Sequence, residues 1–187
     1  YIIMESHQYF DKEMSTKHDD TDIYWSLEKR QISNLENYLS ENNVNKESDK
    51  EIIVKYIYRY VIENLKPSSF STSLSGGVRR GSIEILNTSL PSTPEDYADV
   101  LKTLLSYHDI PAIYTIGYVS EISSYQDNGM FHYWVQAFNG QEWVVLDPYL
   151  EDYSDVSLFG REQLDHITLL NRTDDSIFPI LTYYSDN

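Results

Sequence analysis

The sequence predicts an α+β fold, in which N-terminal helices pack on an antiparallel β-sheet. Apolar residues recur at helical spacing in the first half of the chain, whereas short β-branched and aromatic runs follow residue 111. Asn139-Gly140 joins two of these runs, and this dipeptide is the strongest short signal for a β-hairpin. With 187 residues, 41% of them hydrophobic, the chain can bury one core.

Two helices are expected before residue 68. The first should begin near Thr21, capped by Asp20 or Thr21 itself, with a stripe formed by Trp25, Glu28, Ile32, Leu35 and Leu39. The second should run from about Ser48 to Leu65, with apolar residues nearly all round it, and stop before Pro67. We therefore expect residues 1–47 to be an irregular segment plus a helix, and residues 48–187 to form the main domain.

The next segment, residues 68–92, is rich in Ser and Gly and indicates a long loop in which residues 83–86 favour a short strand. A third helix is expected from Pro94 to about His108. Thr93 is a good N-cap, and proline is well tolerated at the first helical position. Glu95 and Asp96 complement the positive end of the helix dipole. This helix start is the best defined in the sequence.

Strands are expected over residues 112–119, 131–138 and 141–147. A two-residue loop at Asn139-Gly140 would place His132 directly opposite Asp147, with Cβ atoms about 5 Å apart. A carboxylate at that distance can hold the imidazole in one tautomer, as in the base-and-orienter pair of a nucleophilic enzyme. The same face should carry Trp134, Gln136, Trp143 and Val145. A purely structural His–Asp pair remains the alternative.

Three ordered motifs carry a resemblance to a known family. The stretch 94–118 reads PEDYADVLKTLLSYHDIPAIYTIGY, residues 132–135 read HYWV, and residues 143–148 read WVVLDP. Together they resemble the core of the transglutaminase-like superfamily, whose fold is papain-like, over about residues 48–149. The resemblance implies that His132 is the counterpart of the catalytic histidine and Asp147 that of the orienting aspartate. It places the family's catalytic cysteine at Pro94.

The chain contains no cysteine, which excludes thiol catalysis, and Pro94 is a helix-starting residue rather than a nucleophile. We therefore predict a pseudoenzyme, a catalytically inactive domain that serves as a binding or scaffolding module. The alternative is a hydrolase or acyltransferase of the same fold with a non-cysteine nucleophile. Ser92 is its nearest candidate, because the Thr93 hydroxyl should be occupied as the helix cap. A purely structural domain within a larger chain is the third possibility.

The net charge of −16 disfavours nucleic acid and anionic lipid as partners, and Arg79-Arg80 is an isolated basic pair. No apolar run is long enough for a membrane helix, so no membrane insertion is expected. Seventeen tyrosines favour a protein or peptide partner. The candidate cleft residues are Tyr118, Tyr133, Trp134 and Trp143.

No cofactor and no metal are expected. His108 ends a helix near the strand turn and could lie close to His132 and Asp147, but these residues do not amount to a ligand set. The cysteine-free composition and the start at Tyr1 favour a processed bacterial protein, either exported or at the cell surface. The oligomeric state is left open.

Overall fold

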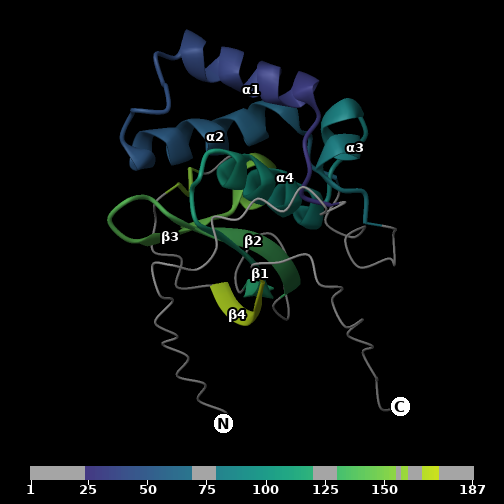
Figure 1. The fold of residues 1–187 in the computed structure, drawn as a ribbon. Coiled ribbons are helices and arrows are strands. Elements are labelled where there is room, and N and C mark those ends of the chain that lie inside the picture. Colours follow the sequence, from purple (N-terminus) through teal and green to yellow (C-terminus); the bar gives the residue numbers. More distant parts are fainter. Residues whose placement is uncertain (1–23, 69–78, 120–129, 155–156, 160–165, 173–187) are drawn as a thin grey trace, which may run out of the picture.

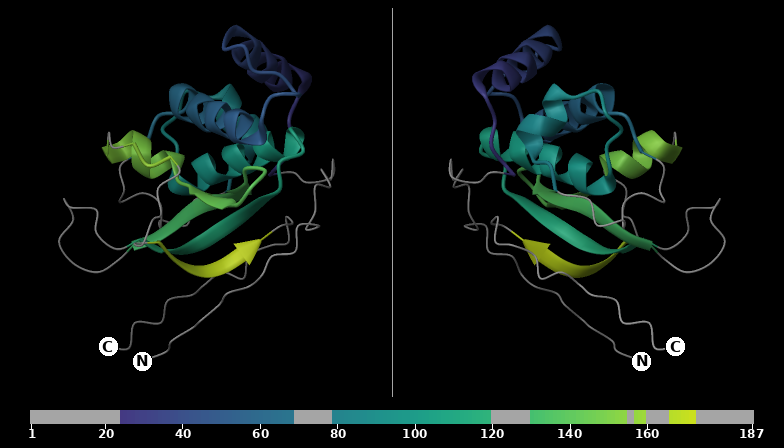
Figure 2. Two further views of the ribbon diagram at one scale, coloured as in Figure 1. Left: turned by 90° about the vertical axis from the view of Figure 1, so that its left-hand side faces the viewer. Right: turned by 90° about the vertical axis from the view of Figure 1, so that its right-hand side faces the viewer.

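The computed structural model describes residues 24–68, 79–119, 130–154, 157–159 and 166–172. Their strands are β1 (Ala112–Val119), β2 (Met130–Phe138), β3 (Trp143–Leu146) and β4 (His166–Arg172). The strands form one antiparallel sheet in the order β3-β2-β1-β4, and the helices lie over one side of it (Figures 1 and 2). The α+β class and its antiparallel sheet are confirmed.

The central helix is α4 (Pro94–Tyr107), which lies between the sheet and the outer helices (Figure 2). The outer pair is α1 (Lys29–Glu41) and α2 (Lys50–Asn64). Because α4 is covered on both sides, Leu101, Leu104 and Leu105 are fully buried. Two short helices, α3 (Ser82–Asn87) and α5 (Pro148–Ser154), pack beside this layer.

The first helix begins later than the sequence indicated, at Lys29. Glu28 and Gln31 form a capping box there, which supplies the partners that the first amides of a helix need. Trp25 lies ahead of the helix and is buried. Its indole Nε1 donates a hydrogen bond to Asp99 of α4 at 2.7 Å, so the buried N–H has a partner. The expected caps Asp20 and Thr21 lie outside the described residues.

Two further expectations about the helices were wrong. Residues 83–86 belong to helix α3, which starts where the Ser82 amide donates to the Tyr24 carbonyl and the Ser82 hydroxyl meets Thr103. Helix α2 is not buried on all sides, since Ile52 is 42% exposed. Its neighbours α1 and α4 leave one strip of it in solvent.

The hairpin loop between β2 and β3 is longer than expected. Phe138 faces Trp143 and Val135 faces Leu146, so residues 139–142 all belong to the loop. The Asn139 side chain accepts hydrogen bonds from the amides of Gln141 and Glu142, both at 2.9 Å, and so removes Gln141 from the ladder. The register moves by two residues. Because side chains alternate with a period of two, each one stays on its predicted face.

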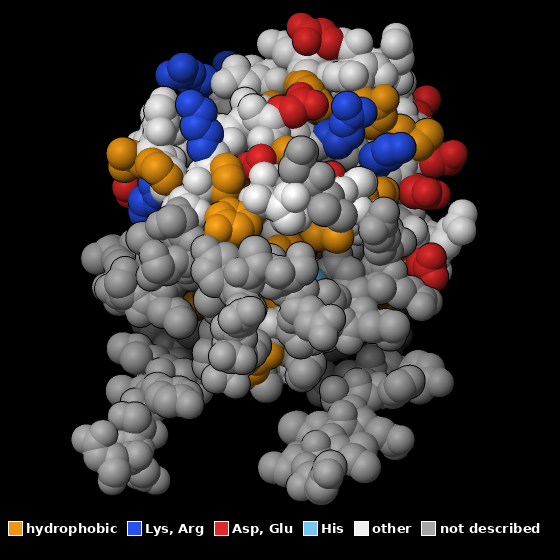
Figure 3. Space-filling model, turned by 180° about the vertical axis from the view of Figure 1, so that it is seen from behind, with side chains coloured by type: hydrophobic (Ala, Val, Ile, Leu, Met, Phe, Trp, Pro, Cys, Tyr) orange, Lys and Arg blue, Asp and Glu red, His pale blue; other side chains and the backbone are white. Residues whose placement is uncertain are grey.

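The described surface carries charges of both signs. Figure 3 shows acidic and basic side chains interspersed over the helical part of one face, without a continuous basic stripe. Within the described ranges, no helix has the length and apolar character needed to cross a bilayer.

Candidate functional site

A buried histidine–aspartate pair lies at the edge of the sheet. His132 is on β2, opposite Gly117 of β1, and Asp147 follows the last residue of β3. The imidazole Nε2 is 2.6 Å from the Asp147 Oδ2, and both side chains are fully buried. Because Val135 pairs with Leu146, Asp147 would stand opposite Trp134 if the ladder continued. The imidazole therefore reaches the carboxylate diagonally along one face, rather than directly across the ladder as predicted.

Asp147 also starts helix α5. Its Oδ1 accepts a hydrogen bond from the Leu150 amide at 2.9 Å, the usual geometry of an N-cap aspartate. Its backbone carbonyl accepts from the Tyr58 hydroxyl of α2 at 3.0 Å. One contact holds the carboxylate and the other holds the backbone of Asp147, so its orientation toward His132 is set by the fold.

A second histidine, which the sequence analysis did not identify, completes the site. His166 is the first residue of β4, and its Nε2 is 2.9 Å from the same Asp147 Oδ2. Its side chain is 2% exposed. In the sequence His166 belongs to none of the three family motifs. Its position could be found only by knowing that β4 pairs with β1.

The environment keeps Asp147 ionised. Burial alone would raise the pKa of this carboxyl, but the charge and hydrogen bond of His132, followed by those of His166, hold the pKa well below its usual range. An ionised carboxylate can only accept hydrogen bonds, so the Nε2 atom of each imidazole donates to it. The arrangement holds two oriented imidazoles on one buried anion.

The four predicted cleft residues are not all brought together. Trp134 is buried beside the pair, with its ring perpendicular to that of His166 and the ring centroids 4.8 Å apart. Trp143 lies beside Phe138, next to the hairpin loop, about 20 Å along β2 from His132. Tyr118 and Tyr133 alternate with Gly117 and His132 and so point to the opposite face.

The start of α4 is built as the sequence predicted. The Asp96 amide donates to the Thr93 hydroxyl at 3.2 Å, and the Thr93 amide donates to the Asp96 carboxylate at 2.7 Å. Pro94 is buried at the first helical position. The position that the family motif assigns to its nucleophile thus holds a pyrrolidine ring inside a complete capping box.

Ser92, the nearest alternative nucleophile, forms two backbone hydrogen bonds with the segment that follows α2. Its amide donates to the Lys66 carbonyl at 2.8 Å, and its own carbonyl accepts from the Ser68 amide at 2.9 Å. Ser92 is 1% exposed. The segment before α4 is therefore tied to the end of α2.

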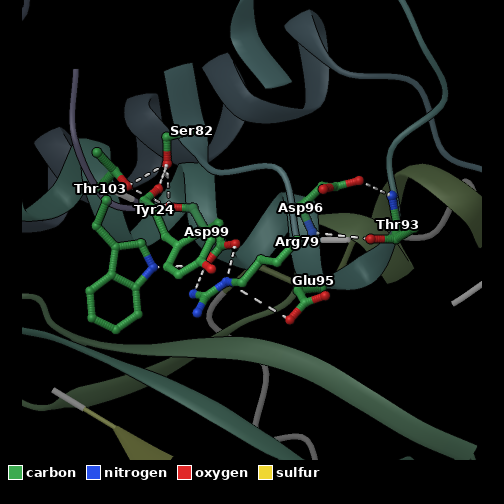
Figure 4. A network of polar contacts seen from close by, with 9 residues as sticks. Tyr24, Arg79, Ser82, Thr93, Glu95, Asp96, Asp99 and Thr103 are labelled. Carbon is green, nitrogen blue, oxygen red and sulfur yellow. Dashed lines mark hydrogen bonds and ion pairs between the residues drawn. The ribbon is translucent and has the colours of Figure 1, made fainter. Parts of the chain in front are cut away.

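A second buried charge cluster, also not identified from the sequence, lies on α4. Arg79 contacts Asp99 through two guanidinium nitrogens, with Nε 2.9 Å from Oδ2 (Figure 4). The guanidinium carbon also lies 4.3 Å from the ring centroid of Tyr24 and 5.3 Å from that of Tyr114. Neighbouring Arg80 pairs with Asp96. The basic pair is therefore engaged with acids of α4.

Glu95 lies at the edge of this second cluster, 3.9 Å from the Arg79 Nε (Figure 4). Burial, and then the charge of Asp99, raise the pKa of Glu95 to about 7, although Arg79 opposes the rise. Glu95 therefore changes its charge near neutral pH, whereas the usual glutamate is fully ionised there.

No described group of three or more His, Cys, Asp or Glu side chains has an arrangement that would hold a metal ion. His108, considered with His132 and Asp147 in the sequence, lies at the C-cap of α4, at the other end of that helix from Thr93. The site thus consists of two oriented imidazoles on one carboxylate. Because the chain contains no cysteine, none of its residues can provide a thiol there.

Helices before an antiparallel sheet, with a His–Asp pair on adjacent strand ends, define an α+β domain of the papain-like type. Residues 37–148 match the family model described as the transglutaminase-like superfamily, which is more than half of the chain. The chain belongs to that superfamily. Comparison with the curated proteins found no match.

Among solved structures, the chain is similar to a proposed cysteine protease from Cytophaga hutchinsonii. The two share 18% sequence identity with a TM-score of 0.48. The similarity covers 71% of this chain but 43% of that one, so this chain corresponds to less than half of the longer protein.

Proposed function

We propose that this domain is a catalytically inactive member of its superfamily and acts as a binding or scaffolding module for a protein or peptide, within an exported or surface protein of a bacterium. The observation that carries the proposal is Pro94, which stands at the motif position of the nucleophile in a chain without cysteine. The Thr93 hydroxyl next to it is used by its own helix. The His132–Asp147 pair is retained, and here it joins the sheet to α5.

A direct test is an activity screen of the folded protein. Peptide hydrolysis, amide hydrolysis and amine incorporation into a glutamine substrate should all be absent from the wild-type protein. Turnover that disappears in His132→Ala, while a Lys55→Ala control retains it, would overturn the proposal. Lys55 is an exposed residue of α2 and provides a matched surface substitution.

The alternative enzyme would need a serine or threonine nucleophile. A fluorophosphonate probe should leave the wild-type protein unlabelled, because Ser92 is buried and its backbone is hydrogen-bonded to Lys66 and Ser68 in the segment after α2. Labelling that is lost in Ser92→Ala would favour the alternative and contradict inactivity.

Restoring the thiol tests whether Pro94 occupies the nucleophile position. In Pro94→Cys the new side chain would be at the first position of α4, where the helix dipole favours a thiolate. Its pKa should therefore lie at least about one unit below the usual value of about 8.5. Thiolate absorption, corrected by subtracting the wild-type titration, measures it. Leu90→Cys, at a residue 59% exposed outside any helix, is the control. Equal pKa values in the two variants would contradict the assignment.

A further inference from the structure

A pocket of about 180 Å³ lies at the opposite end of α4 from Pro94. It is formed where the start of α2 meets the turn between α4 and β1, and its lining includes Lys46, Lys50, Ile53, Tyr107, His108 and Ile110. Helix α4 has 14 residues, which corresponds to about 20 Å between its ends. The lining contains neither His132 nor Asp147, and Ile110 precedes Ala112, which pairs with Ala137, five residues along β2 from His132. The pocket is therefore separate from the His132–Asp147 site.

Positive charge dominates one side of this pocket. Lys46 and Lys50 are exposed, and neither forms an ion pair within the part of the chain that the structure describes. The Lys46 Nζ lies 5.7 Å from the centroid of the Tyr107 ring. Helix α2 begins at Lys50, and its N-cap Asp49 makes no side-chain capping bond. The first amides of α2 thus lack a side-chain cap, and the positive end of the helix dipole lies at the pocket.

The opposite side holds a buried imidazole without a hydrogen bond. The His108 side chain is 3% exposed, and among the described residues its Nε2 has no hydrogen-bond partner. The Glu36 Oε1 lies 3.8 Å from this nitrogen, too far for a hydrogen bond, and among the described residues it too has no hydrogen-bond partner. Burial, together with the charge of Lys46, lowers the pKa of His108, although Glu36 and Asp109 oppose this. A buried polar atom without a partner costs about 1–3 kcal/mol, which a ligand oxygen would recover.

The acidic groups at this end of α4 limit how much negative charge a ligand in the pocket can carry. Asp109 also lines the pocket, and the carbonyl end of the α4 dipole points toward it. Among the lining side chains two lysines outweigh the one carboxylate of Asp109, while Glu36 and the N-cap Asp49 add negative charge outside the lining, in a chain whose net charge is −16. Ile53, Ile110 and the Tyr107 ring supply an apolar wall beside the charged groups. A ligand with one anionic head and a small apolar body fits both parts.

We propose that this pocket binds a small organic oxyanion, with its carboxylate or phosphate head between Lys46, Lys50 and the start of α2, and its body against Ile53 and Tyr107. The volume is below the range of about 300–1,000 Å³ that holds drug-sized ligands, so the ligand is a small metabolite-like acid. This site does not depend on whether the His132–Asp147 pair is catalytic.

Amide NMR titration of the full chain with phenyl phosphate tests the site. Saturable shifts should appear at Lys50, His108 and Asp109, with a Kd of about 1 mM or tighter. Benzoate and inorganic phosphate, titrated in parallel, show which head group and how much of the apolar body contribute. Benzyl alcohol, which has no charge, should give no saturable shift.

Matched variants decide whether the shifts report this pocket. Lys50→Gln and Lys46→Gln should each weaken phenyl phosphate binding at least about fivefold, the loss expected for one charged hydrogen-bonding partner. Lys55→Gln, on the same helix but outside the lining, should leave the Kd unchanged. The proposal is wrong if no ligand saturates, or if all three variants bind like the wild-type protein.

Discussion

Asp99 and Asp147 are both fully buried, and the chain surrounds them with different cations. Asp99 faces the guanidinium of Arg79, which stays charged at every accessible pH. Asp147 faces two imidazoles, His132 and His166, and an imidazole can donate a hydrogen bond without carrying a charge. The first carboxylate therefore has a permanent cation as its partner, whereas the partners of the second carboxylate need no charge to donate to it. The difference predicts how each cluster responds when its carboxylate is neutralised.

The largest expected effect comes from neutralising Asp99. In Asp99→Asn the Arg79 guanidinium stays charged and largely buried without its closest counter-ion, with only Glu95 left at 3.9 Å, which should cost about 3–5 kcal/mol. In Asp147→Asn no obligatory charge is left behind, because an imidazole can donate without a charge, so we expect the smaller cost of about 1–3 kcal/mol of a disrupted buried hydrogen bond. Urea unfolding of both variants measures the two free energies.

A surface pair provides the reference for this comparison. Glu63 lies 3.9 Å from Arg59 on the exposed side of α2, so Glu63→Gln should change the free energy of unfolding by at most about 0.5 kcal/mol. If Asp147→Asn proves as costly as Asp99→Asn, the type of partner does not decide the cost and the comparison fails.

A second prediction concerns pH and belongs to the Asp99 cluster alone. The pKa of Glu95 is raised from 4.5 to about 7 by burial and by Asp99, so the native state keeps a proton that the unfolded chain has already released. The stabilisation is complete below about pH 4.5 and is lost as pH rises through about 7. Since Glu95 is partly exposed, we expect a loss of about 1–2 kcal/mol, below the full value of the shift.

Glu95→Gln separates this contribution from that of every other ionisable group. Glutamine does not titrate, so the difference in stability between wild type and variant should change across pH 4.5 to 7, with the wild type losing stability relative to the variant. Unfolding free energies at several pH values measure the difference. A difference that does not vary with pH would show that Glu95 ionises as it does in water.

The two clusters also differ in how far the sequence revealed them. His132 and Asp147 were placed on one face by strand alternation and the family motifs, and a loop error of two residues did not matter because two is the side-chain period. Arg79 and Asp99 come from a glycine- and serine-rich segment and from the middle of a helix, where no local pattern links them. His166 was missed for the same reason. Local sequence signals predicted the strands, the helix starts and the faces on which side chains lie. The residues that meet only through long-range packing could be identified only from the three-dimensional structure.

Apart from the surface reference, the smallest expected effect concerns the first turn of α4, which carries Glu95 and leads to Asp99. Thr93→Ala removes the hydroxyl that accepts from the Asp96 amide, and should cost about 1 kcal/mol. Thr93→Ser keeps the hydroxyl and should stay within a few tenths of a kcal/mol of the wild type. Thermal and urea unfolding measure both. If Thr93→Ala is neutral, the helix start is held by Pro94 and by the Arg80–Asp96 pair instead. The Thr93 hydroxyl next to Pro94 would then not be needed as the helix cap.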